Sequence, residues 1–232
     1  MQISFFVKLS IFMSLNCYAD IFKEMQFVTE SNPPYVVVSE NHTLSGEIGS
    51  KVVNAFQKLQ LDPKKIEVLP WTRALLTARN NKNVMLFPVA KTFERMEYLD
   101  FAIKVYEQKL YFYKLKKNEN IKLTKFDDAK KYSICVVRDT NTHETLKYEK
   151  FTNFEETTHY SNNIEKFLNN RCQLIILSDK TVKDKIKEFN ASFDDLEQLI
   201  EANKIDGNMY ITFSKGTHPS VVKKFKKAFQ KN

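Results

Sequence analysis

The fold is decided by residues 69–101, whose sequence is LPWTRALLTARNNKNVMLFPVAKTFERMEYLDF. Pro70 is expected to end a strand, and Trp71 to Arg79 then has the hydrophobic spacing of a short helix. The apolar run from Val84 to Ala90 has the length and composition of a buried strand. A strand, a helix and a second strand in this order predict an α/β sheet.

Charged and polar side chains follow directly after the predicted strand at Val84 to Ala90, namely Lys91, Thr92 and Arg95. In an α/β sheet the carboxyl end of a strand opens onto the crevice where ligands bind. A guanidinium carries a fixed charge and a planar fork of donors that suits a carboxylate. We therefore expect an anion-recognising cleft with Arg95 as its anchor.

On the N-terminal side, Gln26 to Thr29 is predicted to be a strand, followed by a loop from Glu30 to Tyr35. The loop contains Pro33 and Pro34, which make it stiff and extended. It could hold Glu30 and Tyr35 toward the cleft, and a simple surface turn is the alternative. A helix opening at Gly46 and a strand from Lys65 to Leu69 lead to the stretch quoted above.

On the C-terminal side, an alternating aromatic segment predicts a strand that leaves the first unit, and a second α/β unit follows. A ligand held between the two units would meet Arg95 on one and Asp179 on the other, which are complementary to the carboxylate and ammonium of an amino acid. The predicted elements are strand 106–115, strand 132–137, loop 138–142, helix 143–151, helix 162–169, strand 172–177, a helical region 180–204, strand 209–214 and helix 219–230.

The first 19 residues have one charge, Lys8, and an apolar body that ends in small residues, which is the pattern of a secretory signal peptide. We expect cleavage after Ala19 and an exported, periplasmic mature chain. A buried N-terminal strand or helix is the alternative. No later segment has the length and hydrophobicity of a membrane span, so the mature chain is expected to be soluble.

Composition excludes several function classes. The 232 residues contain only four glycines, too few for a glycine-rich phosphate loop. The formal charge of +8 is spread along the chain, and the lysine cluster near the C-terminus is best explained as the solvated face of a helix. The four histidines lack metal-ligand spacing. We expect no nucleic-acid partner, no metal and no cofactor.

Two cysteines remain after the predicted cleavage, Cys135 and Cys172, each within an apolar, strand-like run. In an exported protein they could form a disulfide if the two strands are neighbours. Two buried free thiols explain the sequence equally well.

Several motifs resemble a known family. They are Phe27 to Glu30 with Pro33 to Tyr35, the PW-x-R-A motif at Pro70 to Ala74, Lys91 to Arg95 followed by Phe101, and Tyr210 to Lys215. The chain resembles the bacterial extracellular solute-binding proteins of family 3, which bind amino acids and similar small polar solutes in the periplasm. This resemblance implies a two-lobed periplasmic-binding-protein fold of type II.

The resemblance also implies a division of the chain: residues 20–109 with 208–232 form lobe 1, and residues 110–207 form lobe 2. The hinge is expected near Glu107 to Phe112 and Ile205 to Tyr210. Closure of the lobes over the solute would then be a hinge motion.

Site residues follow from the resemblance one at a time. Arg95 matches the arginine that pairs with the ligand's α-carboxylate, and Asp179 matches the acid that takes its α-amino group. Trp71 lies near the aromatic residue that stacks over the ligand. Thr140 lies in the second-lobe loop that helps to bind the carboxylate. Arg73 belongs to the PW-x-R-A motif, and it either contacts the ligand or braces the hinge.

Each of these roles has a structural alternative. Trp71 could be an ordinary core residue. Arg95 could form a structural salt bridge with Glu94 or Asp100. Asp179 could be the N-cap residue of the following helix.

The sequence also departs from the family. Phe87 to Ala90 stands where amino-acid binders have small hydroxyl residues, and Asp139 stands where glycine is usual. These departures put the ligand class in doubt.

The leading hypothesis is therefore a non-catalytic, monomeric binding protein that traps an amino acid or a related small carboxylate for uptake through a membrane permease of an ABC transporter. The alternative is a sensor module that binds a small ligand and signals to a membrane receptor. An enzyme is disfavoured, because no constellation of nucleophile, base and orienting group is recognisable in the sequence.

Overall fold

The computed structural model describes residues 21–230, so the predicted signal peptide and its cleavage position after Ala19 lie outside it. The described residues group into two units. Unit 1 comprises those within Met1–Val89, Tyr98–Val105 and Tyr210–Asn232, and unit 2 comprises Ala90–Glu97 and Tyr106–Met209. The short segment Ala90–Glu97, which the sequence analysis assigned to lobe 1, therefore packs with unit 2.

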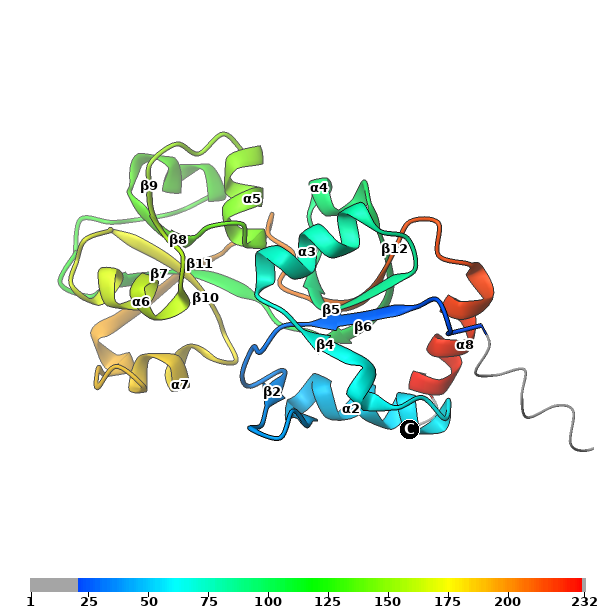
Figure 1. Cartoon of the computed structure of the whole chain (residues 1–232). Helices are drawn as coiled ribbons and strands as arrows, with labels where there is room; N and C mark the ends of the chain where they lie inside the picture. The colour runs from blue at the N-terminus through cyan, green and yellow to red at the C-terminus, as the bar shows by residue number, and fades with distance from the viewer. Residues whose placement is uncertain (1–20, 231–232) are drawn as a thin grey trace, which may run out of the picture. The chain divides into compact units, whose positions relative to one another are not determined.

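Unit 1 is built on a five-stranded sheet in the order β4-β1-β5-β12-β6 (Figure 1). The inner strand β1 pairs in parallel with both β4 and β5. The predicted bounds of β1, β5 and β12 are confirmed. The strands are β1 (Gln26–Thr29), β4 (Ile66–Val68), β5 (Val84–Ala90), β6 (Leu99–Tyr106) and β12 (Met209–Ser214), and a separate antiparallel pair consists of β2 (Val37–Val38) and β3 (Leu44–Ser45).

Helices cover both faces of the unit 1 sheet because its central strands are apolar on both sides. Phe27 packs against Phe56 with ring centroids 4.7 Å apart, on the face covered by α2 (Gly46–Lys58) and α8 (Pro219–Gln230). Val28 points to the opposite face and belongs to the cluster that contains Ala74 of α3 (Trp71–Asn80). In Figure 1, α3 lies above the sheet, with α2 and α8 below it.

Unit 2 has a second five-stranded sheet, in the order β11-β7-β10-β8-β9. Strands β10, β8 and β9 are parallel, whereas β7 runs antiparallel to both β10 and β11. The elements of this unit are α4 (Phe93–Met96), β7 (Leu110–Leu115), η2 (Phe126–Lys131), β8 (Ile134–Val137), α5 (Asn141–Tyr148), β9 (Phe154–Thr157), α6 (Tyr160–Leu168), β10 (Leu174–Ser178), α7 (Val182–Lys187), η3 (Phe193–Asp195) and β11 (Leu196–Glu201).

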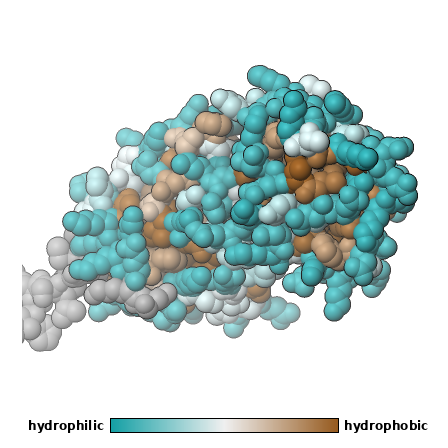
Figure 2. Space-filling model, turned by 180° about the vertical axis from the view of Figure 1, so that it is seen from behind, coloured by the Kyte–Doolittle hydropathy of each residue, from teal (hydrophilic) through white to brown (hydrophobic). Residues whose placement is uncertain are grey.

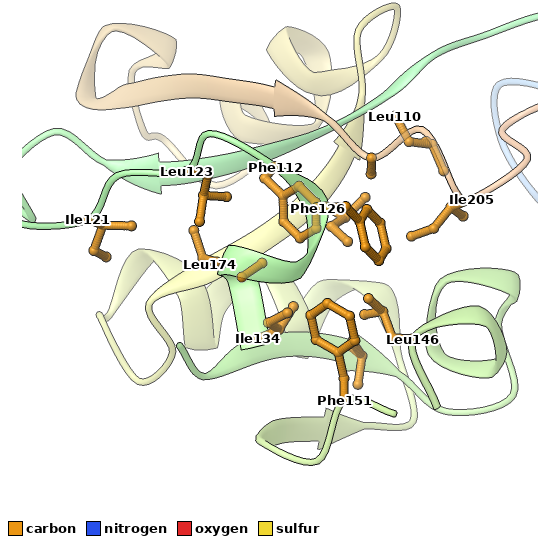
Figure 3. Packing of buried hydrophobic residues seen from close by; sticks show 14 residues of the cluster. Leu110, Phe112, Ile121, Leu123, Phe126, Ile134, Leu146, Phe151, Leu174 and Ile205 are labelled. Carbon is orange, nitrogen blue, oxygen red and sulfur yellow. The ribbon is translucent and has the colours of Figure 1, made fainter. Parts of the chain in front are cut away.

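Alternate residues of the central strands form two separate cores in unit 2. Phe112 of β7 faces one side, where it packs against Phe126, which in turn packs against Phe151 (Figure 3). Tyr113 faces the other side and packs beneath α6 and α7 with Cys135. Because successive strand residues point to opposite faces, a single strand supplies both cores.

The prediction that residues 180–204 are helical is wrong over much of its length. Helix α7 ends at Lys187, and Leu196–Glu201 forms β11, which pairs with β7 at the edge of the sheet. Edge strands carry exposed charged and polar residues, here Glu197 and Gln198, and such residues resemble the solvated face of a helix. Strands β6 and β9 were also missed, although β6 shows the alternation of buried and exposed residues that is typical of a strand.

The surface seen from behind is covered mainly by hydrophilic side chains, with separate areas of hydrophobic ones (Figure 2). Isolated exposed apolar residues are normal on folded proteins. Between residues 21 and 230, no helix combines the length and the hydropathy that crossing a bilayer requires.

The two cysteines of the described chain lie side by side in unit 2. Cys135 is on β8, and Cys172 lies two residues before the start of β10, the parallel neighbour of β8. The structure joins them in a disulfide with the Cα atoms 5.6 Å apart, within the range that a disulfide requires. Both side chains are buried, at 1% exposure.

We expect the oxidised protein to contain this bridge, and reduction to lower the free energy of unfolding by about 4 kcal/mol, because the bridge closes a loop with a sequence separation of 37 residues. Peptide mapping of the unreduced protein detects the linked peptides, and denaturation with and without reductant measures the stability. The Cys135→Ala/Cys172→Ala double variant is the control, since reductant must not change its stability. Two alkylatable thiols at these positions in the oxidised, unfolded protein would contradict the assignment.

Candidate functional site

Two candidate residues of unit 1 lie where neighbouring parallel strands end. Glu30 follows β1 and Trp71 opens α3 just after β4, and these strands pair with Thr29 opposite Val68. The Leu69 N–H donates to the Thr29 carbonyl at 2.9 Å, which keeps the two strand ends together. Trp71 is half-buried and packs against the cluster beneath α3, so it also contributes to the core.

The loop that follows Glu30 is docked on the start of α2. The carbonyl of Tyr35 accepts hydrogen bonds from the N–H groups of Ile48 at 2.8 Å and Gly49 at 3.1 Å. Gly46 has φ +85°, and a Cβ atom there would lie 2.8 Å from the Tyr35 carbonyl oxygen, so glycine is required for this close approach. The Tyr35 side chain is buried, at 3% exposure.

Arg73 lies on α3 with an exposed side chain. Its carbonyl accepts a hydrogen bond from Thr77 Oγ1 at 2.8 Å, a contact within the helix. This bond involves only the backbone of Arg73. The role of the Arg73 guanidinium stays a prediction.

The predicted anchor, Arg95, is among the most deeply buried side chains of unit 2, at 2% exposure. It lies on α4, whose N-cap is Thr92. Its Nη1 donates to the Ala90 carbonyl at 3.0 Å, and its Nη2 donates to the Asp139 carbonyl at 2.9 Å. The same Nη2 forms an ion pair with Glu144 Oε1 at 2.8 Å.

Glu144 is a partner of Arg95 that was not predicted from the sequence. It lies on α5, and its side chain is 18% exposed. Its Oε1 accepts from Arg95, while its Oε2 accepts from the Thr92 hydroxyl at 2.8 Å. Because Glu144 is 49 residues from Arg95, no local sequence pattern indicates the pair.

The loop between β8 and α5 brings Asp139 and Thr140 close to Arg95. Asp139 has φ +58°, in the left-handed region that favours glycine, the residue that the family resemblance leads one to expect at this position. Thr140 is the N-cap of α5; its hydroxyl donates to the Val137 carbonyl at 2.7 Å and accepts from the His143 N–H at 3.4 Å. The Thr140 hydroxyl therefore stabilises the loop and the start of the helix.

Asp179 follows β10, the strand next to β8, and is exposed. Its carboxylate accepts from the backbone N–H of Lys109 at 3.2 Å, and its own N–H donates to the Lys109 carbonyl at 3.1 Å. The N-cap residue of α7 is Thr181, so the alternative role suggested for Asp179 belongs to a different residue. Asp179 instead holds the backbone of Lys109, just before β7, through these two hydrogen bonds.

Asp179 also affects the pKa of a buried tyrosine, Tyr113. Burial and, to a smaller extent, the negative charge of Asp179 raise the pKa of the Tyr113 hydroxyl to about 12. That hydroxyl donates to Gln198 Oε1 at 3.0 Å. Both effects favour the neutral phenol over the phenolate.

Two hollows of unit 2 differ in what they could hold. An open groove of about 520 Å³ has one buried charge, Lys114, which is already paired with Glu197 at 3.2 Å. A cavity near Thr140 measures about 40 Å³, far below the few hundred Å³ of usual ligand pockets. This cavity is therefore large enough for water and too small for an amino acid. It is lined by Cys135, Val136, Val137, Thr140, Thr142, Tyr160, Asn163, Ile164, Ile176, Leu177 and Lys185.

No family model matches the sequence, and no curated protein matches it. Solved structures do match. A histidine kinase sensor domain with similarity to periplasmic binding proteins is 12% identical with a TM-score of 0.70, over 89% of each chain. The substrate-binding protein of an amino acid ABC transporter is 20% identical with a TM-score of 0.65, over 88% of this chain and 91% of that one.

An ancestral arginine-binding protein bound to arginine is 16% identical, with a TM-score of 0.68 over 90% of this chain and 92% of that one. At such low identities the likeness concerns the fold alone. It agrees with the element order and with the two helix-covered sheets described above. The chain therefore has the two-lobed periplasmic-binding-protein fold of type II.

Arg95→Ala is expected to lower the free energy of unfolding by about 3–5 kcal/mol, because it removes the buried partner of Glu144. Chemical denaturation measures the change. Arg73→Ala is the matched control: its side chain is exposed, so its effect should stay within about 0.5 kcal/mol. Equal effects of the two substitutions would contradict a structural role for the Arg95 ion pair.

Tyr113 is expected to ionise near pH 12, so the stability that its neutral form provides is present below pH 10, the ordinary pKa, and is lost as the pH rises toward 12. Spectroscopic titration of phenolate absorbance in the wild type and in Tyr113→Phe isolates this group. Asp179→Asn should lower the pKa of Tyr113 only in part, because burial is the larger cause. A normal pKa in Asp179→Asn would show that the charge dominates instead.

Proposed function

We propose that the chain is a non-catalytic binding protein for a small polar solute, acting in the periplasm after export. The whole-chain likeness in fold to structures of solute-binding proteins carries this proposal. Proteins of this fold serve different purposes, so the function of this chain depends on its particular residues.

Those residues support a polar ligand. In unit 1, Glu30 and Trp71 follow two neighbouring parallel strands. In unit 2, Asp139 and Asp179 follow two others, and both side chains are exposed. The carboxyl ends of parallel strands are where open α/β sheets bind ligands. Carboxylates accept hydrogen bonds and an indole offers a flat apolar face, a combination that suits a small solute with polar groups and a short carbon skeleton.

Uptake is the role that we propose first, with the solute passed to a membrane permease. A sensor module is the second candidate, and the likeness to a histidine kinase sensor domain over 89% of the chain favours it. The two roles share the binding step and differ in the membrane partner. Genes for a permease and an ATPase beside this gene would support uptake, whereas a membrane receptor gene in that place would support sensing.

Titration of the purified protein with a panel of amino acids, amines, sugars and polyols tests the binding step. At least one solute should bind in calorimetry and should stabilise the fold by about 2.7 kcal/mol at a hundred times its Kd, read as a rise in Tm. Asp179→Asn should weaken the binding of that solute about ten-fold or more, as expected when a charged partner is removed. Asp194→Asn, which changes an exposed acid on η3, should not. A panel without any binder would contradict the proposal.

A further inference from the structure

One of the chain's own carboxylates occupies the position that a carboxylate ligand would take at Arg95. Thr92 Oγ1 and Arg95 Nη2, which we call the Thr92–Arg95 donor pair, each bind one oxygen of Glu144 at 2.8 Å. A carboxylate ligand would bind two such convergent donors in the same way, one oxygen to each. All three residues belong to unit 2.

The donor pair is enclosed as well as occupied. Arg95 is 2% exposed, and it also donates to the carbonyls of Ala90 at 3.0 Å and Asp139 at 2.9 Å. A solute carboxylate could reach it only by displacing Glu144, which would leave that carboxylate, now 18% exposed, without its cationic partner. Breaking a buried ion pair on one side is strongly unfavourable, because the remaining charge stays poorly solvated.

Two carboxylates at the ends of neighbouring strands of unit 2 favour a different kind of solute. Asp139 and Asp179 follow neighbouring parallel strands and are exposed. Carboxylates only accept hydrogen bonds, so they suit a solute that donates them. The charge of Arg95, which would otherwise attract an anion, is neutralised by Glu144.

We propose that Glu144 is a specificity-determining residue: by filling the Thr92–Arg95 donor pair it excludes carboxylate solutes and directs the site to hydrogen-bond donors without a carboxylate, namely amines and polyols. This inference rests on the proposed solute-binding function and names its solute class. It differs from the expectation drawn from the family resemblance, in which Arg95 holds the solute's carboxylate.

Matched solutes test the class directly. Each amino acid is titrated against the amine that its decarboxylation gives, for example arginine against agmatine and histidine against histamine, and sugars and polyols are titrated alongside. The wild type should bind no amino acid more tightly than its amine. If it binds an amino acid about ten-fold more tightly than the amine, a difference of about 1.4 kcal/mol, and Arg95→Lys abolishes that preference, the proposal is overturned.

Removing the chain's own carboxylate tests the mechanism without knowledge of the natural solute. Glu144→Ala empties the donor pair, so acetate should bind there and raise the Tm saturably, while chloride at the same ionic strength should not. If Glu144→Ala does not fold, Glu144→Gln serves instead, because its neutral amide keeps the shape and competes less well with acetate. The matched control is Glu165→Gln, an exposed glutamate on α6. Equal acetate responses in the wild type, the Glu144 variant and the control would overturn the proposal.

The two failures can be told apart. If the wild type binds nothing in the solute panel, the proposed function fails, yet acetate still reports whether Glu144 fills the donor pair. If the wild type binds an amino acid through Arg95, the proposed function stands and the role of Glu144 falls.

Discussion

Every central strand of the two sheets buries both of its faces, and this constraint decides where polar chemistry can be placed. Phe27 and Val28 on β1, like Phe112 and Tyr113 on β7, point into separate cores on opposite sides of one strand. The middle of each sheet therefore has no room for an uncompensated polar side chain. Polar groups collect where the strands end, and the candidate residues Glu30, Asp139 and Asp179 all lie there.

The same constraint explains how much of the fold could be predicted. Strand β5 is buried on both faces and gives a continuous apolar run, and its bounds were predicted correctly from the sequence. The strands β7, β8 and β10 were also predicted, with bounds that differ from the observed ones by one to four residues. Edge strand β11 is exposed on much of its surface and carries charges, so its sequence resembles a helix and the prediction failed. Leu196 is buried because it lies opposite Leu115 of β7. Leu115 is distant along the chain, so the sequence around Leu196 does not indicate this partner.

The candidate site was less predictable than the fold. Residue type and strand-end position identified Arg95 and Asp179, the family resemblance added Thr140, and the roles of these residues in binding remain predictions. The partner of Arg95 could not be found in this way, because Glu144 approaches from a helix that starts 46 residues after Arg95. An acid in the first turn of a helix is common for reasons of helix stability alone, so its presence carried no signal of a buried ion pair.

The bridge between Cys135 and Cys172 has a consequence for the polar groups of unit 2. The chain between the two cysteines contains Asp139, Thr140 and Glu144, so these three candidates lie on one covalent ring whose ends are both anchored in the sheet. When α5 opens locally, the bridge limits how far the segment between the two cysteines can extend. This restraint removes conformational entropy from the unfolded segment, so the part of unit 2 that carries these residues has less freedom to lose on folding. The restraint exists only while the two sulfur atoms stay bonded, which ties the stability of unit 2 to the redox state of its surroundings.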